Sequence, residues 1–100
     1  MTMIFRRFNK NFPFGDMPNT MCFTCCHVLD NNKPILYVSH DEDGCWQFLC
    51  GQMHSQEDAR IISLSEIISF DKNILKLGDL QCGEYASFEE NKRKWRVFKK

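Results

Sequence analysis

The segment from residue 35 to residue 50 constrains the fold of this chain more than any other part of the sequence. Its first six residues are rich in β-branched and aromatic side chains, as is typical of a strand, and its last six have the same character. Between them an acidic stretch ends at Gly44, where a glycine tolerates the left-handed backbone of a tight turn. The pattern predicts a β-hairpin in which Trp46, Phe48 and Cys50 share one face. We expect Trp46 and Phe48 to anchor the core.

Further short elements are expected on both sides of this hairpin. Leu64 and Ile67 recur at helical spacing, and Ser63 or Ser65 can cap the helix that they predict over residues 64–70. Short strands are predicted at residues 60–63, 84–88 and 94–98, and a strand, or a knuckle followed by a strand, at residues 21–28. The predicted class is α+β, a small antiparallel sheet with one or two short helices packed on it.

The length of 100 residues favours a single domain and excludes the larger enzyme scaffolds. Residues 1–20 hold four phenylalanines spaced among Asn, Pro and Gly, which predicts an aromatic, partly ordered N-terminal arm. Residues 21–100 then form the domain. A core of this size is small, so a covalent or metal link would add useful stability.

The net charge of zero hides an uneven distribution along the chain. Residues 22–91 carry four basic and twelve acidic side chains, whereas residues 92–100 carry six basic ones. The acidic body favours a protein partner with a basic surface, because nucleic-acid binding needs clustered Lys and Arg. The basic end mixes cations with Trp95 and Phe98, so it either binds nucleic acid or forms an edge strand protected by its charges. Nucleic acid is the less favoured partner, and the sequence assigns no oligomeric state.

The N-terminal residues lack the apolar stretch of a secretory signal, and no apolar run in the sequence is long enough to cross a membrane. We therefore expect a cytoplasmic protein without membrane association. The six cysteines would be reduced in that compartment, so they do not by default form disulfides.

Two clusters of cysteine and histidine have the spacing of metal ligands. Cys22 and Cys25 form a C-x2-C motif, and Cys50 and His54 form a C-x3-H motif beyond the predicted hairpin. Structural zinc is held by four such thiolate and imidazole ligands, usually from two local clusters. The spacing predicts one structural zinc on Cys22, Cys25, Cys50 and His54. A competing ligand set replaces Cys22 with His27.

Two other interpretations of the cysteines stay open. Free cysteines are often simply buried and behave as small apolar side chains without any metal. A redox role for Cys22 and Cys25 requires the first thiol at the start of a helix, and the following residues predict a turn instead. The sequence also lacks the motifs of nucleophilic serine enzymes, phosphate-binding loops and zinc proteases, so we expect no enzymatic activity.

The tip of the predicted hairpin concentrates charge. His40, Asp41, Glu42 and Asp43 follow one another there. Such a tip can contact a cation or a basic partner loop, and the alternative is a solvated turn.

Several of these motifs carry a resemblance to known proteins. The W-Q-F-L-C-G sequence at residues 46–51, with C-x-H-V at residues 25–28 and the later His54, resembles a family of small uncharacterised bacterial proteins. A more distant resemblance, to an immunity-protein domain of polymorphic toxin systems, rests on Gly44, Trp46, Phe48, Gly51, Leu64, Ile67, Asp71 and Gly83.

The second resemblance implies a function. It implies a non-enzymatic cytoplasmic protein that neutralises a toxin by direct binding, and it supplies no catalytic residues. The alternative from the residues themselves is a zinc-stapled small domain that binds nucleic acid through residues 92–100.

Overall fold

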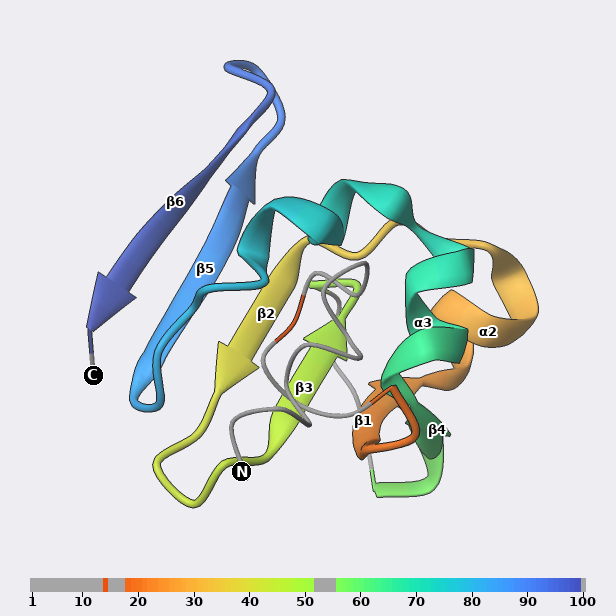
Figure 1. Ribbon diagram of the computed structural model, residues 1–100. Helices are drawn as coiled ribbons and strands as arrows, with labels where there is room; N and C mark the ends of the chain where they lie inside the picture. Colours follow the sequence, from red (N-terminus) through yellow and green to blue (C-terminus); the bar gives the residue numbers. More distant parts are fainter. Residues whose placement is uncertain (1–13, 15–17, 52–55, 100) are drawn as a thin grey trace.

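The computed structural model describes residues 14, 18–51 and 56–99 (Figure 1). Within these residues six strands form one sheet in the order β4-β1-β3-β2-β5-β6. Short helices accompany the sheet, which confirms the predicted α+β class. The strands are β1 (Met21–Cys25), β2 (Tyr37–His40), β3 (Trp46–Leu49), β4 (Ala59–Ser63), β5 (Glu84–Glu89) and β6 (Lys94–Lys99).

The sheet is mixed, where the hairpin pattern led us to expect an antiparallel one. β1 pairs in parallel with β3, with Phe23 opposite Gln47. The other strand pairs among the described residues are antiparallel, including the predicted hairpin of β2 and β3. β3 lies between β1 and β2 in the sheet. The chain returns through α2 and enters β2 in the direction opposite to β1, and the hairpin then turns it back, so β3 runs parallel to β1.

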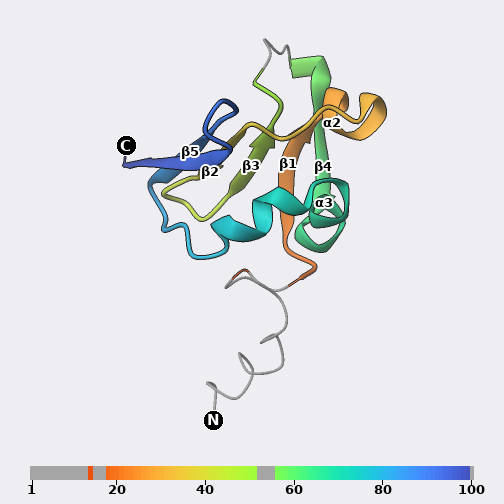
Figure 2. The same cartoon turned by 90° about the horizontal axis from the view of Figure 1, so that it is seen from above.

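The helix predicted at residues 64–70 is present as α3 (Leu64–Phe70). Ser63 is its cap, because its hydroxyl accepts a hydrogen bond from the Glu66 N–H at 3.2 Å. The Glu66 carboxylate in turn accepts from the Ser63 N–H at 3.3 Å, which completes a capping box. After α3 the chain continues as the 3-10 helix η2 (Lys72–Leu77), and both lie over one face of the sheet (Figure 2). In the part of the chain that the structure describes, no helix has the length and apolar character needed to cross a membrane.

The strand prediction for residues 21–28 is wrong beyond Cys25. The chain turns there into α2 (Cys26–Asn31), whose only buried side chain among the described residues is Val28. The helix ends at Asn32, which adopts a left-handed backbone with φ of 55°. Cys, His and Val favour helices only weakly, so the local sequence does not predict helix α2.

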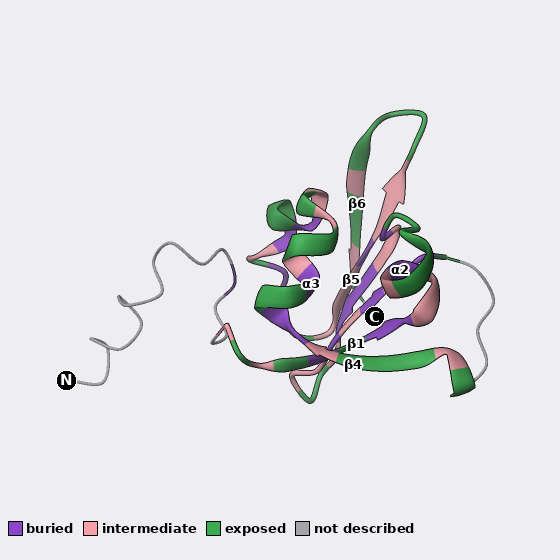
Figure 3. Cartoon of the chain, turned by 90° about the vertical axis from the view of Figure 1, so that its right-hand side faces the viewer, coloured by how far each residue is buried: buried purple, intermediate pink, exposed green. Residues whose placement is uncertain are grey.

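The core lies between the sheet and the elements α3 and η2. Trp46 and Phe48, the expected anchors, are 1% and 0% exposed. Phe14, from the predicted arm, is 3% exposed, and its ring centroid lies 4.8 Å from that of Trp46. At least this residue of the arm therefore belongs to the core, whereas residues 1–13 and 15–17 lie outside the described residues. Figure 3 shows burial concentrated on the central strands, while β4 is exposed along most of its length.

Candidate metal centre

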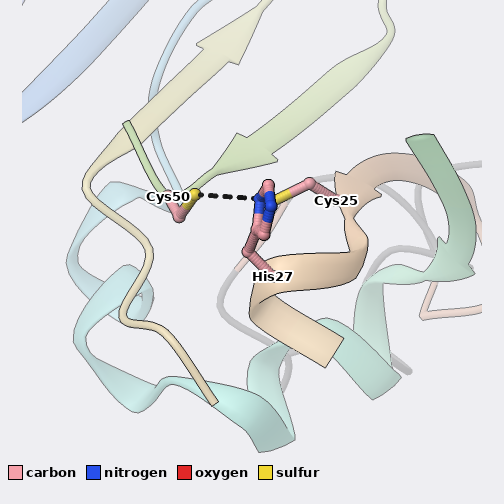
Figure 4. Close-up of side chains that lie close together, drawn as sticks. All are labelled: Cys25, His27 and Cys50. Carbon is pink, nitrogen blue, oxygen red and sulfur yellow. Dashed lines mark hydrogen bonds between the residues drawn. The ribbon is translucent and has the colours of Figure 1, made fainter. Parts of the chain in front are cut away.

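The parallel pairing of β1 and β3 brings two cysteines to the same end of the sheet. Cys25 is the last residue of β1, and Cys50 directly follows β3. Because the two strands run side by side in the same direction, their carboxyl ends are neighbours. Helix α2 begins immediately after Cys25 and places His27 in its first turn. Figure 4 shows the three side chains pointing toward one another.

The geometry of these three residues suits a metal ion. Their ligand atoms all lie within 4.8 Å of one another, and the group could hold a metal ion. The Cys50 Sγ and the His27 Nδ1 are 3.7 Å apart. Tetrahedral zinc, with bonds of about 2.3 Å to sulfur and about 2.0 Å to nitrogen, would separate such a pair by roughly 3.6 Å. Cys25 and Cys50 are 1% and 5% exposed, while His27 is half-buried.

The structure does not bring Cys22 to this group. In an extended strand, residues three apart point to opposite faces and are separated by roughly 10 Å. The thiols of Cys22 and Cys25 therefore cannot bind the same ion here. The Cys22 thiol instead donates to the Ile62 carbonyl oxygen at 3.2 Å across the β1–β4 pair. Burial, with a smaller contribution from the Glu66 carboxylate, raises the pKa of Cys22 to about 12.

The same observations bear on the redox interpretation of Cys22 and Cys25. A helix does follow the motif, contrary to our expectation, but it starts at Cys26 and leaves Cys22 inside β1. A redox-active thiol needs a lowered pKa, and that of Cys22 is raised. Both features disfavour thiol–disulfide chemistry at this motif.

The competing ligand set fits the structure better than the first one. It consists of Cys25, His27, Cys50 and His54, and the structure places the first three together. His54 lies outside the described residues. Its role as a fourth ligand stays a prediction from the spacing to Cys50.

A second group of potential ligands adjoins the first and shares His27. It consists of Cys26, His27 and Asp58, and all three are half-buried. The Cys26 thiol donates to Asp58 Oδ1 at 3.6 Å, and burial together with this bond raises the pKa of Cys26. A thiol that donates to a carboxylate retains its proton, so this group is the weaker metal site. Nothing in the local sequence pairs residues 26 and 58, and we did not predict this contact.

The acidic hairpin tip has an internal hydrogen-bond network. The Asp41 carboxylate accepts from the Ser39 hydroxyl at 2.5 Å and from the Gln47 amide at 2.8 Å. Asp43 accepts from the Cys45 N–H at 3.1 Å, which is a local turn contact. His40 is only 8% exposed, so Glu42 and Asp43 are the exposed members of this set. Partner binding at the tip stays a prediction.

Comparisons with protein-family models, curated proteins and solved structures gave no significant match. The two resemblances noted in the sequence therefore stay predictions.

Proposed function

We propose that this chain is a small binding domain stabilised by one structural zinc ion on Cys25, His27 and Cys50. The observation that carries the proposal is the convergence of three ligand atoms within 4.8 Å, from the ends of two strands and the first turn of a helix. Two thiolates and an imidazole are soft or borderline ligands. They favour zinc over magnesium or calcium, which prefer oxygen.

His54 is the fourth ligand that the sequence offers, because it follows Cys50 by four residues. Four protein ligands close the coordination shell of the metal, as in structural zinc sites, whereas three leave a position for water. The resulting Cys2His2 set matches a structural role and agrees with the expected absence of catalysis.

The metal would act where the fold has weak local support. Helix α2 has six residues, too few for stability on its own, and no side-chain cap hydrogen bond is found among the described residues. Zinc on its first turn would join it to the ends of β1 and β3. Metal binding that occurs only in the folded state adds directly to folding stability.

Elemental analysis of the chain purified without added metal tests the proposal. We expect close to one zinc per chain in the wild type and a large loss in Cys25→Ser, His27→Gln and Cys50→Ser. Cys45→Ser is the matched control, because Cys45 is a half-buried thiol outside both groups of potential ligands. Zinc near zero in the wild type, or unchanged zinc in all three ligand variants, would contradict the proposal.

Cobalt substitution tests the fourth ligand separately. The absorption of bound Co2+ reports the coordination number and thiolate contacts, so His54→Gln should weaken binding and change the spectrum if His54 is a ligand. An unchanged spectrum and affinity would leave water as the fourth ligand and would limit the site to Cys25, His27 and Cys50.

For the biological role, we propose binding of a protein partner, as the immunity-protein resemblance implies. The supporting observation is an apolar surface on β1 and β4, formed by Met21, Phe23 and Ile61, which are 58%, 40% and 65% exposed. Phe23 and Ile61 are direct cross-strand neighbours. Contiguous exposed apolar side chains of this kind are typical of interaction sites.

The nucleic-acid alternative has less support in the structure. Residues 94–99 form β6, which is an edge strand, as predicted for a basic end. Lys94 and Lys99 lie opposite Glu89 and Glu84 of β5, and Arg96 forms an ion pair with Glu89 at 3.4 Å. Acidic neighbours reduce the positive potential that phosphate binding needs.

Two experiments separate these roles. Co-expression with a neighbouring toxin-like reading frame should restore growth, and Ile61→Asp should lose this protection. Val97→Asp is the control, because Val97 is 50% exposed on the distant β6. Equal protection by both variants would contradict binding through β1 and β4.

A nucleic-acid binding assay at several salt concentrations tests the alternative. Salt-sensitive DNA or RNA binding that Lys94→Glu abolishes would favour it.

A further inference from the structure

A second pairing of cysteine and histidine lies outside the candidate metal centre. Cys82 is exposed on the loop between η2 and β5, and its Sγ lies 3.6 Å from Nε2 of His40. His40 is the last residue of β2 and is 42 residues away along the chain. Neither residue belongs to the groups of potential metal ligands found in the described part of the chain.

The histidine ring is oriented so that one nitrogen can accept a proton. His40 Nδ1 lies 2.8 Å from the Leu80 carbonyl oxygen, which can only accept a hydrogen bond. Nδ1 therefore carries the proton of the neutral ring, and Nε2 presents its lone pair to the Cys82 thiol. The imidazole also stacks on Trp46, with 3.9 Å between ring centroids, which fixes its plane.

The loop that carries Cys82 is held over His40 by backbone hydrogen bonds. The Gly83 N–H donates to the His40 carbonyl oxygen at 2.7 Å, and the Glu84 N–H donates to that of Gln81 at 3.0 Å. Gly83 has a φ of 88°, a conformation that other residues rarely adopt. The sulfur is therefore positioned beside its base in the folded protein.

We propose that Cys82 is a reactive thiol with His40 as its base, and that it is a modification site for small disulfides. The pair has the elements of an activated nucleophile: an exposed thiol, a base within reach, and a third group that orients the base. The other cysteines differ. Cys22, Cys25 and Cys50 are buried, and a neighbouring carboxylate contacts each of the thiols of Cys26 and Cys45.

The modification is a thiol–disulfide exchange. The Cys82 proton passes to His40 Nε2, and the sulfur attacks one sulfur of the disulfide. A new S–S bond forms at Cys82 while the S–S bond of the reagent breaks. The leaving thiolate takes a proton back from the imidazolium. The cysteine is oxidised, and half of the reagent is reduced to a free thiol, so no further oxidant is needed.

The charges around the pair indicate the class of disulfide. A Cβ placed on Gly83 would lie 3.6 Å from Glu42 Cγ, and Glu84 lies opposite His40 in the β2–β5 pair. Lys99 lies opposite Glu84 on β6. These three side chains carry a net charge of −1, which favours the approach of a cationic disulfide over an anionic one.

The test uses the full chain with its metal and a limiting amount of cystamine, a small dicationic disulfide. Peptide mapping by mass spectrometry should find the first adduct on Cys82, at least about tenfold ahead of Cys45. Oxidised glutathione, which is anionic, should react several-fold more slowly. Adducts that form on Cys45 or Cys26 as fast as on Cys82 would overturn the proposal. This comparison is made within the wild-type protein and requires no variant to fold.

His40→Gln then tests the base. Near neutral pH the rate at Cys82 should fall by about tenfold or more, and the difference should shrink at alkaline pH, where the thiol ionises without a base. Far-UV circular dichroism checks that the variant folds, and zinc content measured on the same samples keeps this result separate from the metal proposal. An unchanged rate at Cys82 in the folded variant would overturn the role of His40.

Discussion

Two regions in the described part of this chain combine cysteine with histidine, and their surroundings give them different chemistry. The group of Cys25, His27 and Cys50 is largely buried and converges from three elements, whereas the pair of Cys82 and His40 has one exposed thiol and one buried base. Three converging donors, two of them buried and one half-buried, can share a metal ion. One exposed sulfur beside an oriented imidazole can attack an electrophile. The number of donors and the access of solvent, rather than residue type, distinguish the two.

The largest expected effect is a loss of stability when zinc is removed. It should depend on the group of Cys25, His27 and Cys50 and not on the pair of Cys82 and His40. Chelation of zinc should lower the free energy of unfolding by about 4 kcal/mol if free zinc stands near 1,000 times its dissociation constant. Thermal denaturation with and without chelator measures this effect. Cys50→Ser should be insensitive to chelator, whereas Cys82→Ser should respond like the wild type. A wild type that is equally stable with and without chelator would contradict a stabilising role for zinc.

A second prediction concerns alkaline pH and distinguishes Cys22 from the proposed metal ligands. The pKa of Cys22 is raised from 9.0 to about 12 in the folded state, so unfolding favours its ionisation. Its contribution to stability is present below pH 9 and is lost as the pH rises toward 12. The slope is at most about 1.4 kcal/mol per pH unit for one thiol. Denaturant titrations of wild type and Cys22→Ala should differ in this slope, and identical slopes would contradict the burial of a neutral thiol.

A third prediction compares the two helices. Helix α3 has a capping box, whereas the described residues provide no side-chain cap for α2. Ser63→Ala should therefore cost about 1 kcal/mol whether or not zinc is bound. Denaturant titrations with and without chelator measure both values. A Ser63→Ala cost that changes when zinc is removed would contradict the independence of α3 from the proposed metal centre.

The smallest expected effect is that of a Cys82 substitution on the free energy of unfolding. Cys82→Ser should change the free energy of unfolding by less than about 0.5 kcal/mol, because Cys82 is exposed. The same variant should lose the fast reaction with cystamine. Chemical denaturation and adduct mapping measure the two properties, and a large destabilisation would indicate that the contact with His40 is mainly structural.

Local patterns predicted much of the fold and less of the site. The β2–β3 hairpin and the Ser63-capped helix follow from residue alternation and spacing, which are local signals. The parallel β1–β3 pair and helix α2 depend on contacts with distant segments. These two features place His27, and not Cys22, beside Cys25 and Cys50 in the candidate metal centre. The contacts of Asp58 with Cys26 and of Cys82 with His40 join residues that are 32 and 42 positions apart in the sequence. Short sequence motifs cannot predict contacts between residues so far apart along the chain.

X-ray absorption at the zinc edge of the purified wild-type chain tests the central claim most directly. We predict a spectrum with two sulfur ligands at about 2.3 Å and nitrogen ligands at about 2.0 Å. Cys50→Ser should lose one of the sulfur ligands or the metal itself. A chain that holds no zinc, or zinc surrounded only by oxygen and nitrogen, would contradict the assignment of Cys25 and Cys50 as metal ligands.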